Sequence, residues 1–445
     1  MNMKKVITYG TYDLLHYGHL RLLERAKALG DYLIVGVTSD DFDRGRDKIN
    51  VQQSFMERVE AVRETGLADE IIAEEYMGQK IDDIKRYGVD IFAIGSDWKG
   101  HFDYLNEYCK VVYLERTAGV SSSELRSEKR EVRLGMIGNY VSVINKFLSE
   151  SKFVNGLGIT GVCCAEPDVE FCGLDINVYS NYEDLLKSSD AIYIASAPDE
   201  HYSHIKKALK CGKHVLCESP VTTNPEHFDE LVELAKSKKC VLMDSIKTAY
   251  LMAYSRLLLL AKSGIIGNIL SVDSTCTSMK EISVNADISN KWNSICAWGP
   301  TALLPVFQLL GTKNYTASII SHMIDPSAKF DGFTKVSLVF PHAVASVKVG
   351  QMVKSEGDLV ISGSKGYIYV PAPWWKTDYY EVRFEDSEMN KRYFYQLDGE
   401  GIRYELVSFV KAINEGQDDF YVNRNVSHEI CNIISTFSQG LITNI

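Results

Sequence analysis

The sequence lacks the features that mark membrane, secreted and zinc-binding proteins. No apolar run reaches the ~20 residues that a membrane-spanning helix needs, and "LLLLAKSGIIG" (257–267) stops far short of that length. The start, "MNMKKVITYG", has no signal-peptide cleavage region, and the ten cysteines form neither a C-x-x-C pair nor a zinc-like spacing. We therefore expect a cytoplasmic protein with reduced thiols and no membrane span.

Positive charge is also in short supply. The chain has 48 Lys+Arg against 59 Asp+Glu, a formal net charge of -11, which argues against nucleic acid or an anionic membrane as the main partner. A few basic side chains in a cleft would still suffice for a phosphate ligand. We find no short-period internal repeat and no low-complexity segment.

The composition that remains is that of a soluble globular protein, with 45% hydrophobic and 24% charged residues. A chain of 445 residues is too long for one ordinary core. The polar stretch "SSSELRSEKRE" (121–131) and a change of pattern near residue 250 predict three domains, at 1–128, 129–250 and 251–445.

Short β-rich runs alternate with amphipathic helical patterns over the first two of these domains. "VITYG" begins the first series and "VRLGMIG" (132–138) the second, and each series predicts a parallel, doubly wound, Rossmann-like α/β sheet. From about residue 268 longer β-like runs such as "VSLVFPHAVASVKVG" predict an α+β domain with a mostly antiparallel sheet. The expected fold class is therefore α/β, with two Rossmann-like domains followed by this α+β domain.

Two histidines, His16 and His19, follow the first predicted strand in "LLHYGHL". A helix that starts at His16 would direct its first amide groups to the carboxyl end of the strand, where open α/β sheets bind ligands. Gly18 permits close approach of a phosphate, and imidazoles three residues apart share one helix face. The spacing therefore indicates stabilisation of a phosphoryl group in transfer, or alternatively a pair of surface histidines or a metal pair.

The longer segment "ITYGTYDLLHYGHLRLLERAKALGDYLIVGV" resembles the H-x-G-H nucleotidyltransferase family, specifically its glycerol-3-phosphate cytidylyltransferases. The resemblance covers about residues 3–127 and includes "VGVTSDDF", "GSDWKG" and "RTAGVSS" in order. It implies that the first domain is a nucleotidyltransferase domain that transfers a cytidylyl group from CTP.

The same resemblance implies roles for individual residues. It assigns phosphate contacts and transition-state stabilisation to His16, His19, Lys48 and Arg116. It assigns nucleotide binding to Gly10, Thr11, Tyr12, Arg46, Asp97, Thr117, Ser121 and Ser122. It places Asp13, Arg58 and Trp98 beside the acceptor substrate.

The first domain departs from the family pattern at two places. Arg46 and Lys48 stand where the family has a K-x-K pair, so the charge is kept and the geometry changes. One residue is inserted before Arg58. Singly, Arg58 also fits a solvated helix face, Asp97 a turn cap and Ser121 and Ser122 a linker.

The implied chemistry is in-line attack by a polyol phosphate oxygen on the α-phosphorus of CTP, with Mg²⁺ bound through the triphosphate. The products would be a CDP-polyol and pyrophosphate. Glycerol 3-phosphate is the default acceptor, with glycerol 2-phosphate or a longer alditol phosphate as alternatives. The resemblance further implies precursor supply for a surface polymer such as teichoic acid or capsule, and a homodimer or larger assembly.

The remaining chain, about 132–445, resembles the glucose–fructose oxidoreductase and inositol dehydrogenase (Gfo/Idh/MocA) family through "APDEHYSHIKKALKCGKHVLCESP" and "SRLLLLAKSGIIGNILSV". Its dinucleotide fingerprint begins at Gly138, but Tyr140 and Val143 replace the second and third glycines. The acidic residue that the family uses for the ribose hydroxyls is expected at about Cys164, and Glu166 follows two residues later.

Further departures fall on the proton-transfer residues. The lysine of the family's E-K-P motif is Ser219, after Glu218, and the family's D-x-G-x-H-x-x-D helix reads Ala297, Thr301 and Leu304 at its key positions. Lys247 and His201 are the remaining polar candidates.

These losses argue against hydride transfer and NAD(P) binding by the usual mode. We expect a non-catalytic module that supports assembly or binds a ligand. The alternatives are an active NAD(P)-dependent reductase that makes the polyol phosphate, and a chain that is only a scaffold, which the set around His16 argues against.

Overall fold

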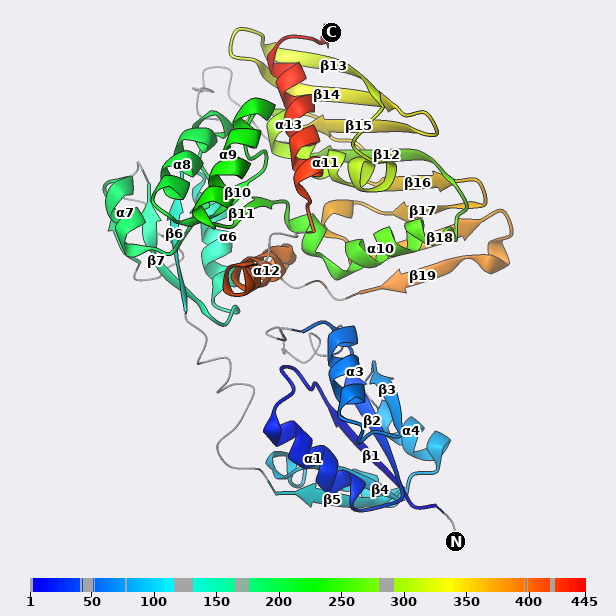
Figure 1. Cartoon of the computed structure of the whole chain (residues 1–445). Helices are drawn as coiled ribbons and strands as arrows, with labels where there is room; N and C mark the ends of the chain where they lie inside the picture. Colours follow the sequence, from blue (N-terminus) through cyan, green and yellow to red (C-terminus); the bar gives the residue numbers. More distant parts are fainter. Residues whose placement is uncertain are drawn as a thin grey trace. The chain divides into compact units, whose positions relative to one another are not determined.

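The computed structural model describes residues 3–40, 42, 51, 53–76, 78–115, 131–164, 171, 176–279, 292–395, 397, 399–416 and 421–445. The chain divides into two compact units, Met1–Arg130 and Glu131–Ile445. Figure 1 shows the elements of each unit.

The smaller unit is built on a parallel five-stranded sheet in the order β3-β2-β1-β4-β5. Its strands are β1 (Lys5–Gly10), β2 (Tyr32–Thr38), β3 (Glu70–Glu74), β4 (Ile91–Gly95) and β5 (Lys110–Leu114). The buried runs of β-branched residues in these strands are typical of a sheet covered on both faces. The expected Rossmann-like fold is confirmed for this unit.

Helices cover both faces of this sheet. One core joins Val6 and Val35 to α1 and α3, and another joins Ile7 and Ile34 to α4 and η2. Successive strand residues thus enter opposite cores, as the two-residue repeat of a strand requires. The helical elements are α1 (Tyr17–Lys27), α3 (Phe55–Glu64), α4 (Gln79–Tyr87), η1 (Ser96–Trp98) and η2 (Asp103–Glu107).

The larger unit begins with a parallel six-stranded sheet in the order β11-β10-β9-β6-β7-β8. Numbered from β6, this is the doubly wound order of a dinucleotide-binding fold. The strands are β6 (Val132–Ile137), β7 (Leu157–Cys163), β8 (Val178–Tyr179), β9 (Ala191–Ile194), β10 (His214–Glu218) and β11 (Leu242–Ser245). The connecting helices are α6 (Val141–Ser151), α7 (Tyr182–Ser188), α8 (Pro198–Lys210) and α9 (Pro225–Lys238).

A nine-stranded sheet completes the larger unit, in the order β19-β18-β17-β16-β12-β15-β14-β13-β20. It is mostly antiparallel, as predicted, although β12 pairs with β15 and β13 with β20 in parallel. The strands are β12 (Ile269–Thr277), β13 (Thr316–Asp325), β14 (Phe330–Val339), β15 (Val344–Gly350), β16 (Leu359–Gly363), β17 (Gly366–Val370), β18 (Tyr379–Phe384), β19 (Lys391–Phe394) and β20 (Thr443–Asn444).

Helices connect the nine-stranded part of the larger unit to its six-stranded part. The apolar helix α11 packs on β12 and β15, and α13 contacts both α11 and α9 of the six-stranded part (Figure 1). The helical elements are η3 (Lys247–Tyr250), α10 (Met252–Lys262), α11 (Ser294–Leu310), η4 (Trp374–Lys376), η5 (Ser387–Met389), η6 (Gly399–Gly401), α12 (Ile402–Glu415) and α13 (Arg424–Ser438).

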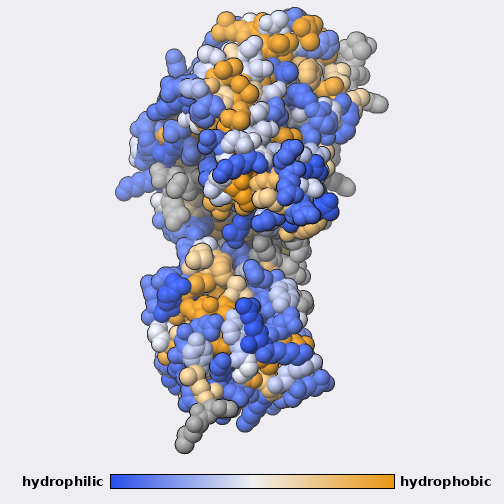
Figure 2. All heavy atoms as spheres, turned by 90° about the vertical axis from the view of Figure 1, so that its right-hand side faces the viewer, coloured by the Kyte–Doolittle hydropathy of each residue, from blue (hydrophilic) through white to orange (hydrophobic). Residues whose placement is uncertain are grey.

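Hydrophilic side chains cover much of the visible face of each unit, and patches of apolar side chains lie among these hydrophilic ones (Figure 2). In the part of the chain that the structure describes, no helix combines the length and the hydropathy that crossing a bilayer would need.

Candidate active site

The strand order of the smaller unit brings two predicted motifs to one edge. Strands β1 and β4 are neighbours, and connections leave them toward opposite sides of the sheet. The His16–His19 segment follows β1, and Asp97 and Trp98 lie in η1 directly after β4. Open α/β sheets bind ligands at such a switch point, outside the carboxyl ends of the strands. The candidate site lies there.

The two histidines are stacked at the start of α1. Their ring centroids are 4.0 Å apart and their planes meet at 23°. The helix begins at Tyr17, one residue later than expected, because His16 has an extended backbone and serves as the N-cap. Its Nδ1 accepts a hydrogen bond of 3.0 Å from the Gly18 amide, so the proton of a neutral ring lies on Nε2.

The turn before the histidines is strained at two non-glycine residues. Tyr12 has φ 54° and Leu14 has φ 49°, a left-handed conformation that costs energy and is held by its surroundings. The buried Tyr12 ring meets the His19 ring edge-on, with centroids 5.5 Å apart. A Cβ on Gly10 would lie 3.0 Å from the same Tyr12 ring. The Tyr12 ring therefore packs against the His19 ring and fixes its position.

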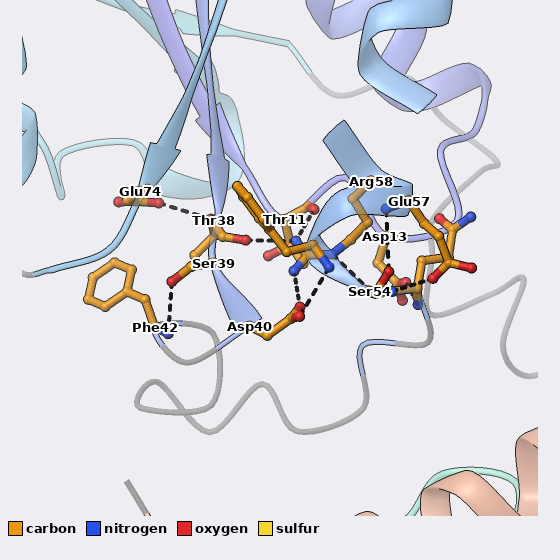
Figure 3. Close-up of polar contacts among 12 residues, drawn as sticks. Thr11, Asp13, Thr38, Ser39, Asp40, Phe42, Ser54, Glu57, Arg58 and Glu74 are labelled. Carbon is orange, nitrogen blue, oxygen red and sulfur yellow. Dashed lines mark hydrogen bonds and ion pairs between the residues drawn. The ribbon is translucent and has the colours of Figure 1, made fainter. Parts of the chain in front are cut away.

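Arg58 lies at the centre of a buried polar cluster (Figure 3). Its side chain is fully buried and donates to the carbonyl oxygens of Gln53, Thr11 and Thr38, at 3.1, 2.6 and 2.8 Å. It also pairs with the Asp40 carboxylate at 2.5 Å. The guanidinium thus ties the ends of β1 and β2 to the start of α3, and a solvated helix face is ruled out for it.

Asp13 is buried as well and holds the same segment. Its Oδ1 accepts a hydrogen bond of 2.9 Å from the Gln53 amide, while the Gln53 side chain accepts one of 2.7 Å from Leu14. This reciprocal pair anchors the chain before α3 to the turn after β1.

Trp98 is open to solvent, with 41% of its surface exposed, beside the rings of His101 and Phe102 at 5.4 and 5.8 Å. Asp97 is exposed next to it. An exposed indole at the switch point is available to stack on a flat ligand group.

Other predicted residues lie outside the described part of the chain: Arg46, Lys48, Arg116, Thr117, Ser121 and Ser122. The structure also reveals polar partners that sequence reasoning missed. Thr38 donates to Glu74 at 2.9 Å, and Glu74 pairs with Lys80. Only the position of Thr38 and Asp40 at the end of β2, in "VGVTSDDF", signalled that this edge carries polar groups.

In the larger unit, the turn after β6 keeps one glycine of a dinucleotide site. Gly138 has φ 144°, and a Cβ there would lie 2.1 Å from the Ala195 carbonyl oxygen. Tyr140 stands at the N-cap of α6 and packs edge-on against Trp292, with centroids 5.6 Å apart. A bulky ring thus occupies the helix terminus where a glycine would admit a pyrophosphate.

Carboxyl groups gather at the ends of β10 and β11. Glu218 accepts a hydrogen bond from Tyr193, and the Ser245 hydroxyl lies 3.4 Å from Glu218 and 3.0 Å from the buried Glu405. Burial raises the pKa of Glu218, raises that of Glu405 strongly, and raises that of Asp244 to about 6. Lys247 pairs with Glu400 at 2.9 Å.

The other sequence candidate in this unit is structural. His201 is buried, with its ring nitrogens 2.8 and 3.0 Å from the carbonyl oxygens of Pro220 and Ser196, and a neutral ring donates to one of the two. Burial lowers its pKa to about 4, so the ring stays neutral. Helix α11, which stands at the position of the family's acid and histidine, carries no Asp, Glu, His or Lys.

Comparisons with known proteins match the smaller and the larger unit to two different families. Residues 7–130 match the cytidylyltransferase-like family, and residues 142–245 match the oxidoreductase family with an NAD-binding Rossmann fold. The chain is 51% identical over 126 residues to the glycerol-3-phosphate cytidylyltransferase of Bacillus spizizenii, covering 28% of this chain and 97% of that one. The corresponding Staphylococcus aureus enzyme is 45% identical, with 28% and 95% covered.

Among solved structures, a 3-ketoreductase from Actinomadura kijaniata, in complex with NADP and TDP-benzene, matches with a TM-score of 0.63. The match covers 71% of this chain and 99% of that one at 15% identity, so it shows the fold of the larger unit.

By its smaller unit the chain belongs to the cytidylyltransferase-like family and is a nucleotidyltransferase. Within the family, the relatives named above are glycerol-3-phosphate cytidylyltransferases.

Proposed function

We propose that the protein transfers the cytidylyl group of CTP to a small polyol phosphate, with glycerol 3-phosphate as the default, and releases pyrophosphate. The stacked His16–His19 pair at the β1/β4 switch point is the observation that carries this proposal. The identity of 51% to a glycerol-3-phosphate cytidylyltransferase supports the choice of acceptor.

The reaction forms a bond between an acceptor phosphate oxygen and the α-phosphorus of CTP, and breaks the bond from that phosphorus to the β-phosphate oxygen. The acceptor phosphate is largely ionised near pH 7, since its second pKa is about 6, so no general base is required. His16 and His19 stabilise charge on the transferring group, and the Gly18 contact to Nδ1 places the proton of a neutral His16 ring on Nε2.

The remaining roles follow the family pattern. Lys48 and Arg116 stabilise the transition state, and the triphosphate and cytosine are held by Gly10, Thr11, Tyr12, Arg46, Asp97, Thr117, Ser121 and Ser122. Trp98 contacts the acceptor, while Asp13 and Arg58 shape its site through the Gln53 and Thr11 contacts.

Magnesium enters with the nucleotide in this proposal. Among the described residues, no group of three or more His, Cys, Asp or Glu side chains is arranged to hold a metal ion. The triphosphate would therefore supply most of the oxygen ligands of Mg²⁺, which binds readily to substrate phosphates.

The larger unit is a non-catalytic module in this proposal. The Tyr140 ring and the apolar helix α11 do not fit NAD(P) binding and proton transfer by the usual mode. The proposal places cytidylyl transfer in domain 1–128 and the oxidoreductase-like module in domains 129–250 and 251–445. It also includes self-association as a homodimer or larger, and precursor supply for a surface polymer.

A second candidate function is an NAD(P)-dependent reductase in the larger unit. It is favoured by the fold shared with a 3-ketoreductase and by the carboxyl groups at the ends of β10 and β11. Titration of the full chain with NADH and NADPH, followed by nicotinamide fluorescence, separates the two, since binding would favour the reductase.

Pyrophosphate release tests the main proposal. The assay uses CTP, Mg²⁺ and a panel of glycerol 3-phosphate, glycerol 2-phosphate, ribitol 5-phosphate and phosphocholine, repeated with ATP. We expect turnover with CTP and one polyol phosphate, and little with ATP. Release with phosphocholine alone, or with ATP in preference to CTP, would contradict the proposal.

A further inference from the structure

Three lysines of the larger unit converge on a single carboxylate. Glu400 Oε2 lies 3.0 Å from Lys146 Nζ and 2.9 Å from Lys247 Nζ, and its Oε1 pairs with Lys376. Partial burial opposes ionisation of Glu400, but the hydrogen bonds from the three ammonium groups outweigh it and hold its pKa well below the usual range. We call these four residues the lysine cluster.

The lysines come from separate elements that meet beside the carboxyl edge of the six-stranded sheet. Lys146 lies on α6, Lys376 ends η4, and Lys247 opens η3 two residues after the end of β11. This edge is where doubly wound sheets bind ligands. Three segments that are far apart in the sequence thus bring a lysine to the same carboxylate. This differs from a surface ion pair between neighbouring turns of one helix.

The lysine cluster has more positive than negative charge. Three ammonium groups against one carboxylate leave a formal excess of two positive charges. Glu218 and Glu405 also carry carboxyl groups near Lys247, and burial raises the pKa of both. Among the residues that the structure describes, Glu400 is the carboxylate that pairs with all three lysines.

The lysine cluster is also within reach of a solute. The exposed fractions of the side chains are 51% for Lys146, 28% for Lys247, 31% for Lys376 and 33% for Glu400. Glu400 has φ 55°, a left-handed conformation that costs energy in a non-glycine residue and is held by its surroundings, as at Tyr12 and Leu14.

We propose that Lys146, Lys247 and Lys376 form a binding site for a phosphate monoester dianion, which Glu400 occupies with its own carboxylate when no ligand is bound. A phosphate offers three terminal oxygens to three ammonium donors, and two negative charges to an excess of two. Inorganic phosphate and a small polyol phosphate share this chemistry. The site lies in the larger unit and needs no activity of the smaller one.

Phosphate binding to the full chain without CTP tests the site, measured by titration calorimetry with inorganic phosphate and with glycerol 3-phosphate. Glu400→Gln removes the internal anion and should bind about tenfold tighter than the wild type. Adding Lys247→Gln to that variant should cost about tenfold, the loss of one charge-assisted hydrogen bond. Lys207→Gln, which breaks the exposed pair with Glu183, is the matched control and should change neither affinity.

The proposal is overturned if Glu400→Gln binds phosphate no tighter than the wild type, or if Lys247→Gln leaves the affinity unchanged. Should thermal melting show that Glu400→Gln is unfolded, Lys376→Gln in the wild-type chain replaces it, and an unchanged affinity is then the contradicting result. Tighter binding of glycerol 3-phosphate than of inorganic phosphate assigns an organic ester to this site if Lys247→Gln weakens it, since binding at the smaller unit would not change, and equal affinities assign the phosphate group alone.

Pyrophosphate release measured on the same variants separates this site from the proposed function. We expect it to stay at the wild-type rate in all of them. Absent pyrophosphate release in the wild type would contradict the proposed function while leaving the binding result intact.

Discussion

At the scale of single residues, the candidate site depends on a few side chains whose positions are fixed by neighbours. His16 is held by its own N-cap contact with Gly18, and His19 rests on the buried Tyr12 ring. Neither histidine belongs to a hydrophobic core, so their function can be removed without removing the fold.

We expect His16→Ala and His19→Ala each to lower the rate of pyrophosphate release by at least about a hundredfold, because each removes a donor to the charge of the transition state. Glu24→Gln, on the exposed face of the same helix, is the control and should keep the wild-type rate. Full activity of both histidine variants, with circular dichroism unchanged throughout, would show that the assigned role is wrong.

Arg58 offers a test of the buried cluster in Figure 3. Arg58→Lys keeps the charge but loses the planar group that reaches Gln53, Thr11, Thr38 and Asp40. We expect a loss of about 2–4 kcal/mol in the free energy of unfolding, measured with urea, since buried acceptors lose their donors.

Arg63→Lys is the matched control for Arg58, because Arg63 forms an exposed pair with Glu60 on the same helix. Exposed pairs contribute less than about 1 kcal/mol, so this change should be small. Equal losses for the two variants would contradict the anchoring role of Arg58.

At the scale of elements, the ends of β10 and β11 give the larger unit a pH dependence. Burial raises the pKa of Asp244 to about 6, while the nearby hydroxyl groups of Ser427 and Ser219 oppose the shift. Because the folded-state pKa lies above the unfolded one, this stabilising contribution is complete below about pH 4 and lost as pH rises through about 6.

Asp244→Asn removes that titration. We expect the variant to be more stable than the wild type at pH 8, by at most about 3 kcal/mol, with a smaller difference at pH 4. Thermal melting at both pH values measures the effect. Asp184→Asn, at an exposed pair with Lys187, is the control. A variant that gains no stability at pH 8 relative to pH 4 would contradict the assignment.

Most of the parallel strands of the two doubly wound sheets were predicted, because each is a short apolar run that ends at a glycine or a polar residue. The two-residue strand β8 (Val178–Tyr179) was missed, since it is too short to form such a run. Strand β13 was missed, since Thr316, Ala317 and Ser318 face solvent and leave no apolar run. The run at 336–350 was read as one piece, although β14 and β15 form a hairpin around Phe340–Ala343.

The candidate site likewise has one part that could be predicted from the sequence and one part that could not. The His16–His19 pair was visible because its spacing is local, and the strand order then places it beside Asp97. The burial of Asp13 and Arg58 could not be predicted, because it depends on contacts with Gln53, Thr38 and Asp40 that only the tertiary fold creates. The lysine cluster was not predicted either, since its members are up to 254 residues apart.

At the scale of the whole molecule, the chain consists of two compact units with separate cores. Only the smaller one carries the histidine pair, so CTP should stabilise one unit and leave the other unchanged.

Differential scanning calorimetry of the full chain should therefore show two transitions, of which CTP raises one. At a hundred times the dissociation constant, CTP adds about 2.7 kcal/mol, roughly 8–10 °C for a unit of this size. NADPH should move neither midpoint in the proposed function. A rise of the other transition with NADPH would favour the reductase alternative.

The central claim is that this chain makes a CDP-polyol. It is tested most directly by phosphorus NMR of the full-length protein with CTP, Mg²⁺ and glycerol 3-phosphate. We predict equal amounts of CDP-glycerol and pyrophosphate, and neither product in the His16→Ala variant. Cleavage of CTP without a CDP-glycerol signal, or the same products from His16→Ala at the wild-type rate, would contradict the account.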